Sequence, residues 1–270
     1  IELVGEKDLL NAIALNSSLF NAARIVGPAA AGVLMGHVGK SMCFFINAVS
    51  FIPVIFGLFM IKAGVQASVP DNGKSIFRNI SEGFRHALGN PRLYKTLFLV
   101  SILGVFAMNF NVLVPVLAKQ VLGMQETGFG LLMSAMGMGA LLGGLAVAAG
   151  SSKSPSYARL LVPYVSLSIL LITTGIVKTF ILAAVLLALA GFCATAFFTT
   201  ANSFIQVNTD DEYRGRIMSL YSLLFAGVTP IGNLFAGGIA EKISVGASFL
   251  ICGTITLGLL VASYGCHRAV

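Results

Sequence analysis

Three polar residues at helical spacing, Ser17, Asn21 and Arg24, are the side chains of this sequence best placed to do chemistry. Spacings of four and three residues bring them to one face of a helix. They lie in an apolar run long enough to cross a membrane, where a charged side chain faces a cavity or a partner. The stripe predicts either a transport path, in which Arg24 binds an anionic group or shapes a proton site, or a structural arginine paired with a neighbouring helix.

Further polar or polarisable side chains interrupt later apolar runs. Buried amides in lipid need hydrogen-bond partners, so each indicates either a bond between helices or a group that faces the path. Asn109 and Asn111 cannot share a helical face, so at most one of them is a path candidate. Met133 and Met136 suit an adaptable apolar pocket or ordinary packing. The candidates for a substrate or coupling path are Ser17, Asn21, Arg24, Asn109, Met133, Met136, Asn202 and Asn233.

Other kinds of chemistry find no support in the sequence. The three histidines are far apart, the four cysteines form no CxxC pair, and no nucleophile stands with a base. The segment Gly36–Ser41 ends like a phosphate-binding loop, but Leu34 occupies the position of the required first glycine. We therefore expect no metal, no cofactor and no enzymatic activity.

The composition is that of a membrane protein. Of 270 residues, 57% are hydrophobic and 10% are charged, and the mean hydropathy is +0.92; a soluble domain carries about 25% charged residues. The net charge of +7 does not indicate nucleic-acid binding, because the basic residues are scattered between apolar runs. The predicted fold is an all-α, polytopic helical bundle.

Eight runs are long and apolar enough to span a bilayer, which takes about 20 residues. Short connections between most of them predict antiparallel neighbours. The eight predicted spans are Leu9–Met35, Met42–Ile61, Leu93–Leu117, Gly128–Ala149, Leu160–Val177, Phe180–Gln206, Ile217–Ala240 and Ala247–Cys266.

The longest polar stretch, Lys62–Pro91, separates the second span from the third. Within it, Phe77, Ile80, Phe84 and Leu88 recur at spacings of three and four, which predicts an amphipathic helix. Such a helix can lie on the membrane surface or serve as a solvated linker. Placing this stretch inside the cell puts twelve of the seventeen Lys and Arg residues on the inner side and four on the outer side, a positive-inside bias.

An internal repeat predicts two halves. A Ser, a Val, a Pro and a Gly of the first span, beginning at Ser17, recur 202 residues later in the seventh span, beginning at Ser219. A period of six helices is that of a transporter with six plus six spans. The chain is then expected to hold the last two helices of a first half (residues 1–62), a cytoplasmic linker (63–91) and a six-helix second half (92–270), with four helices missing upstream.

Two stretches near the beginning of the chain resemble the major facilitator superfamily, in the drug-efflux and siderophore-export branch that includes the enterobactin exporter and macrolide-efflux proteins. Leu9–Pro28 resembles the fifth helix of that branch. Gly27, Pro28 and Gly32 resemble its antiporter motif, with Ala31 where that motif has a glycine.

A third stretch, Tyr213–Ser219, resembles the branch's cytoplasmic loop before the eleventh helix, with Arg214, Gly215 and Arg216 as its motif. The resemblance implies a secondary active transporter that exports amphipathic small molecules of drug or siderophore type across the bacterial inner membrane, by proton antiport and alternating access. Its partners would be the substrate, protons and the lipid bilayer, with no nucleic acid, and the complete protein would be monomeric.

Two alternatives of other kinds stay open at this point. The chain could be a non-transporting membrane scaffold or receptor, or an inactive truncated product. It could also be a facilitator that imports nutrients.

Overall fold

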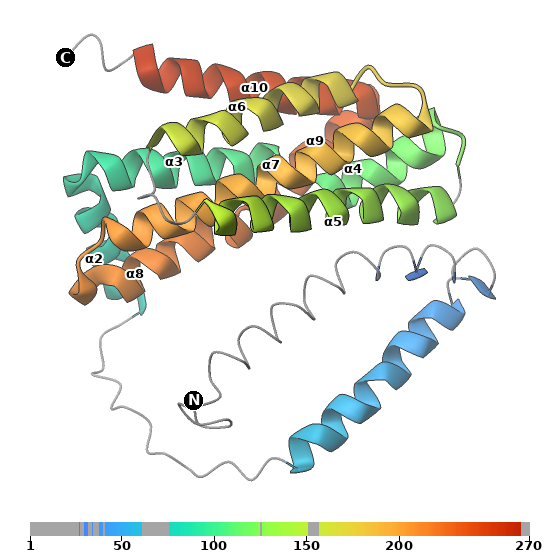
Figure 1. Cartoon of the computed structure of the whole chain (residues 1–270), viewed down its shortest axis with the longest axis horizontal. Helices are drawn as coiled ribbons and strands as arrows, with labels where there is room; N and C mark the ends of the chain where they lie inside the picture. The colour runs from blue at the N-terminus through green and yellow to red at the C-terminus, as the bar shows by residue number, and fades with distance from the viewer. Residues whose placement is uncertain are drawn as a thin grey trace.

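The computed structural model describes residues 41–60, 76–124, 126–150 and 157–265, together with single positions between 27 and 39. Within these residues every regular element is a helix. The helix Ser41–Met60 precedes the labelled ones. The labelled helices are α2 (Ile76–Gly89), α3 (Pro91–Phe106), α4 (Phe110–Val116), α5 (Glu126–Ala149), α6 (Tyr157–Thr174), α7 (Phe180–Val207), α8 (Asp211–Ser222), α9 (Thr229–Lys242) and α10 (Val245–Gly265), with two π-helical segments, η1 (Leu117–Val121) and η2 (Leu223–Gly227) (Figure 1).

Seven helical stretches of the described residues are long and apolar enough to cross a membrane, which confirms the all-α, polytopic fold. They match seven of the eight predicted spans, and most ends differ by only a few residues. The remaining predicted span, Leu9–Met35, lies almost entirely outside the described residues. The seven stretches are Ser41–Met60, Pro91–Val121, Thr127–Ala149, Tyr157–Thr174, Phe180–Val207, Glu212–Lys242 and Val245–Ser263.

Helices α5 and α7 cross with their backbones in contact. A Cβ atom on Gly139 or on Gly143 of α5 would overlap a carbonyl group of α7. A Cβ atom on Gly191 of α7 would in turn overlap the carbonyl group of Met136. Glycines at this spacing let two membrane helices approach closely, so the pair Gly139 and Gly143 is a packing contact.

Helices α6 and α10 lie together along one edge of the bundle (Figure 1). The hydroxyl of the fully buried Tyr164 in α6 donates to the carbonyl oxygen of Thr256 in α10 at 3.0 Å. The hydroxyl of Ser248 in α10 donates to the carbonyl oxygen of Ala236 in α9 at 2.8 Å. Hydrogen bonds to backbone carbonyls thus join α10 to α6 and to α9.

Two of the long spans are interrupted, and the interruptions lie next to each other. The span Pro91–Val121 is broken between α3, which ends at Phe106, and α4, which begins at Phe110. In the span Glu212–Lys242, η2 separates α8 from α9. A Cβ atom on Gly104 of α3 would lie 2.7 Å from the carbonyl oxygen of Leu224 in η2. Irregular backbone at membrane depth is tolerated where protein surrounds it, and here each break is covered by the other span.

The helix predicted in the linker is α2, which packs against α8. Its small residues Gly83 and Ala87 are buried, and a Cβ atom on Gly83 would lie 3.3 Å from the backbone of α8. Phe84 and Leu88 of the predicted apolar stripe are 50% and 53% exposed. The small residues of α2 therefore face the rest of the bundle, and these two large apolar side chains are uncovered.

We expect Gly143→Ala to destabilise the protein by about 1–3 kcal/mol, because overpacking forces backbones or side chains to shift. The added methyl group would overlap the carbonyl group of Phe192. Gly144→Ala is the matched control, since its Cβ atom would meet Cγ2 of Thr195 at 3.7 Å, an ordinary contact. Thermal unfolding of the purified protein, followed by circular dichroism, measures both. Equal thermal unfolding temperatures of the two variants would contradict the conclusion that the backbones of α5 and α7 are in contact at Gly143.

Candidate functional site at the broken helix α3–α4

Asn109 lies at the break between α3 and α4 and is 1% exposed. Its Nδ2 donates to the carbonyl oxygen of Val105, one turn back in α3, at 2.9 Å. The side chain thus turns toward α3 and does not cap α4, and its Oδ1 has no hydrogen-bond partner among the described residues. Asn111 is exposed, so the two neighbouring asparagines occupy different environments, as their spacing predicts.

Helix α9 approaches Asn109 through Gly232. A Cβ atom on Gly232 would lie 2.8 Å from Oδ1 of Asn109 and would overlap the carbonyl group of Val105. The next residue, Asn233, is partly buried, and its Oδ1 also lacks a partner in the described part of the chain. The structure therefore places Asn109 where α9 meets the broken helix, and Asn233 follows the contact residue Gly232 along α9; each side chain has an acceptor without a partner among the described residues. Such oxygens can accept hydrogen bonds from a hydroxyl group, an ammonium group or water.

The two candidate methionines lie in α5. Met133 and Met136 are partly buried and pack against the apolar core. The carbonyl group of Met136 is also the one that Gly191 of α7 approaches closely. These contacts are those of packing residues.

Asn202 lies five residues before the end of α7 and belongs to a different polar cluster. Its Oδ1 accepts a hydrogen bond from Nε2 of Gln206, one turn along. The hydroxyl of Tyr221 in α8 lies within hydrogen-bonding reach of Asn202 and donates to the carbonyl oxygen of Phe198 at 3.2 Å. Asn202 is thus tied to the contact between α7 and α8.

The motif Arg214, Gly215 and Arg216 was expected in a loop, and this expectation is wrong, because all three residues lie in α8. Asp210 in extended conformation precedes the helix, and Glu212 lies in its first turn, where an acidic side chain is favoured by the helix dipole. The charged residues that resemble a loop therefore begin a helix.

Tyr213 connects this motif to the linker helix. The ring of His86 in α2 stacks on it with centroids 4.2 Å apart and planes 5° from parallel. The guanidinium carbon of Arg216 lies 5.3 Å from the centroid of the same ring, within the range of a cation–π contact. The motif therefore helps to hold α2 on α8.

The remaining candidates cannot be placed. Ser17, Asn21, Arg24, Pro28 and Gly32 lie outside the described residues. Gly27 is described at a helical, exposed position, and nothing lies within 4 Å of a Cβ atom built on it.

Sequence reasoning missed two glycines that shape this site, Gly104 and Gly232. Gly104 lets α3 approach η2, and Gly232 lets α9 approach α3. In the sequence each of them is a single glycine inside an apolar run. Such a glycine permits another helix to approach closely, but it does not indicate which helix does so.

The described residues contain seven helices long enough to cross a membrane, and one of them is broken around the buried amide of Asn109. These features define a polytopic helical membrane protein with a polar group in the middle of one span. The model of the family described as "Transmembrane secretion effector", a major facilitator family, matches residues 1–269. The chain therefore belongs to that family of the major facilitator superfamily, and the resemblance noted in the sequence is confirmed.

Curated relatives are transporters, in agreement with the assignment as a non-enzyme. The multidrug efflux pump Tap of Mycolicibacterium fortuitum is 26% identical over 86% of this chain and 57% of the relative. The staphyloferrin A transporter of Staphylococcus aureus is 22% identical over 95% of this chain and 64% of the relative. Macrolide efflux protein A of Streptococcus pyogenes is 23% identical over 96% of this chain and 65% of the relative. The chain thus spans a little under two thirds of the length of these relatives.

We expect Asn109→Leu to leave the thermal unfolding temperature unchanged or to raise it. The substitution loses the Nδ2 hydrogen bond to Val105, a net contribution of about 1 kcal/mol, but it also removes a buried acceptor whose lack of a partner costs about 1–3 kcal/mol. Thermal unfolding of the purified protein measures the difference. A clear loss of stability would show that Asn109 is held for structure.

Proposed function

We propose that the complete protein is a secondary active transporter that exports amphipathic small molecules of drug or siderophore type across the bacterial inner membrane. Family membership and the names of the relatives, which include a multidrug pump, a macrolide efflux protein and a siderophore transporter, support this proposal. Proton antiport is the proposed driving reaction, and the complete protein is proposed to be a monomer.

The proposed mechanism is alternating access between two halves. In this scheme residues 92–270 form the six-helix second half, 63–91 the linker, and 1–62 the last two helices of the first half, with four further helices upstream. The relatives, of which the chain covers 57–65%, are long enough for that arrangement. Transporters bind substrate and coupling ions at the interface of their halves, near the bilayer midplane, where discontinuous helices expose polar groups.

The observation that carries the proposed substrate path is the unsatisfied oxygen of Asn109 at the broken helix, with a second unsatisfied oxygen on Asn233 of α9. In a bilayer, a donor for them must come from another helix, from water or from cargo, because lipid tails supply none. A transported molecule with hydroxyl or ammonium groups supplies such donors and leaves again. Ser17, Asn21 and Arg24 are proposed to line the same path from the first half, beside the antiporter-like motif of Gly27, Pro28 and Gly32.

We expect Asn109→Leu and Asn233→Leu to lower export about threefold to tenfold each, the value of one hydrogen bond to cargo. The assay uses inside-out vesicles with an imposed pH gradient, incubated with a radiolabelled macrolide or a cationic dye. It measures uptake of the compound and the loss of uptake on adding a protonophore. Thr96→Val is the matched control, because this buried hydroxyl is satisfied within α3 by the carbonyl oxygen of Arg92.

Each outcome of that assay separates the proposal from its alternatives. Uptake with no pH dependence would reject proton antiport. Accumulation in intact cells that exceeds that of control cells would indicate an importer, and counterflow absent from purified protein would favour a scaffold. Equal loss in the Thr96→Val control would assign the effect to folding.

We expect Arg24→Lys to lower export while the amount of protein in the membrane stays near normal. Lysine keeps the charge but cannot make the planar, two-pronged contact of a guanidinium group with an anion. Export and membrane-protein level, measured in the same cells, test the role of this residue. Loss of the protein from the membrane would instead identify Arg24 as a structural residue paired with a neighbouring helix.

A further inference from the structure

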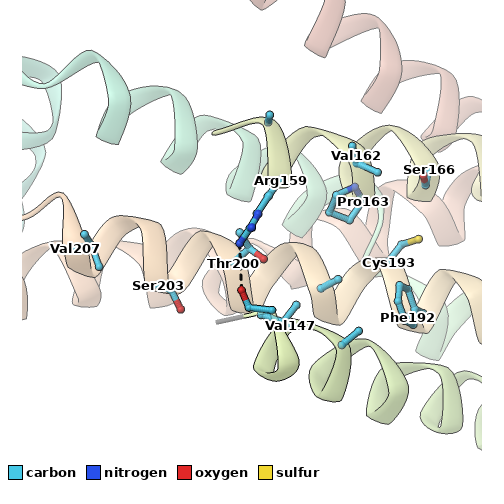
Figure 2. A pocket seen from close by; sticks show the side chains of 14 residues that line it. Val147, Arg159, Val162, Pro163, Ser166, Phe192, Cys193, Thr200, Ser203 and Val207 are labelled. Atoms are coloured by element: carbon cyan, nitrogen blue, oxygen red, sulfur yellow. Dashed lines mark hydrogen bonds between the residues drawn. The ribbon is translucent and has the colours of Figure 1, made fainter. Parts of the chain in front are cut away.

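A cavity of about 710 Å³ lies between α5 and α6, with α7 as its floor (Figure 2). This volume falls within the range of about 300–1,000 Å³ that is typical of ligand pockets. Most of its lining is apolar and includes Val147, Pro163 and Phe192. Val162 and Val207 at its rim are 68% and 70% exposed, so the cavity is a groove open to the surroundings of the bundle.

The groove lies where α5 and α6 both pack on α7. Gly139 and Gly143 fix α5 to α7, and the ring of Tyr164 in α6 contacts that of Phe197 in α7 with centroids 5.6 Å apart, while its hydroxyl bonds to α10. The opposing surfaces carry small side chains at Ala146 and Ala158, which leave the space between them unfilled.

Among the described residues that line the groove, Arg159 is the one that carries a charge. It is the third residue of α6, and its Nη1 donates to the carbonyl oxygen of Gly150, just beyond the end of α5, at 3.2 Å (Figure 2). The guanidinium group is therefore positioned where the groove meets the connection between α5 and α6. Its planar set of N–H donors matches the geometry of phosphate oxygens.

We propose that this groove binds an anionic phospholipid, with one acyl chain between α5 and α6 and the phosphate group on Arg159. A groove that is long, apolar and open sideways in a membrane is filled by the apolar molecule that surrounds it, because water gains few hydrogen bonds there. One cationic residue at one end of such a groove selects a lipid with a negatively charged head. The proposed orientation places this end in the cytoplasmic leaflet, whose anionic lipids attract basic groups.

The site is separate from the proposed substrate path. The path residues Asn109 and Asn233 lie on α3–α4 and α9, none of which contributes to the groove. Lipid binding is measured on purified protein without transport, so its failure and a failure of export are distinguishable.

Native mass spectrometry of the complete protein, released from detergent after incubation with phosphatidylglycerol or phosphatidylcholine, tests the proposal. We expect retention of phosphatidylglycerol over phosphatidylcholine, reduced about tenfold in Arg159→Gln, the scale of a hydrogen bond to a charged group. Arg92→Gln is the matched control, because Arg92 is an exposed arginine near the start of α3, outside the groove.

Cys193 on the floor of the groove gives a second readout. Bound phosphatidylglycerol is expected to slow alkylation of Cys193 by a small maleimide, as followed by peptide mass spectrometry. Ala146→Phe, which fills the groove from an exposed position, should abolish lipid retention without lowering thermal stability, and so provides a variant independent of Arg159.

Three results would overturn the proposal. Equal retention of the two lipids in both the native protein and Arg159→Gln would show that Arg159 does not select a negatively charged head group. Protection of Cys193 by inorganic phosphate alone would define a simple anion site. Protection by a macrolide, but not by phosphatidylglycerol, would make the groove an entrance for cargo.

Discussion

The bundle depends on helices that touch backbone to backbone. Lipid tails are as apolar as leucine side chains, so burial of apolar surface does not drive helices together in a bilayer, and close packing must do so. Gly139, Gly143 and Gly191 supply that packing between α5 and α7, and Gly104 and Gly232 supply it between α3 and the span formed by η2 and α9. Each contact also fixes the position of something else. The first leaves the groove beside α6, and the second presses α9 against the amide of Asn109.

The polar site follows from the second of these contacts. Asn109 uses its amide nitrogen to satisfy the carbonyl group of Val105, and Gly232 lies against its oxygen. The oxygen is therefore enclosed but unpaired among the described residues, and Asn233 on the adjacent helix repeats the condition. A protein that only needed a stable bundle would place apolar side chains here, because an unpaired buried acceptor is unfavourable. The break in the helix, the close approach of Gly232 and the unpaired oxygen of Asn109 thus form one arrangement.

The sequence was sufficient to predict the seven helical spans that the described residues show, because these follow from local hydropathy. The sequence indicated Asn109 and Asn233 as candidates, but it did not indicate which residue packs against Asn109. That residue, Gly232, is more than a hundred positions away in the chain. The prediction of a loop at Arg214–Arg216 was wrong. It interpreted a run of charged residues as a segment without a helix, whereas α8 begins among these residues. The sequence indicated the amphipathic character of α2 but not its orientation, in which Gly83 and Ala87 are buried while Phe84 and Leu88 are uncovered.

The contact between α5 and α7 limits how the described bundle can change shape. Two helices whose backbones meet at several levels cannot slide or rotate against each other without overlap of their atoms, so they move as one rigid body. The irregular backbone at Ala107–Asn109 and at η2 offers places where the described bundle can bend. Those two places are also neighbours, through Gly104 and Leu224. Bending at one of them therefore requires a matching adjustment at the other, and the unpaired oxygen of Asn109 lies at this shared hinge.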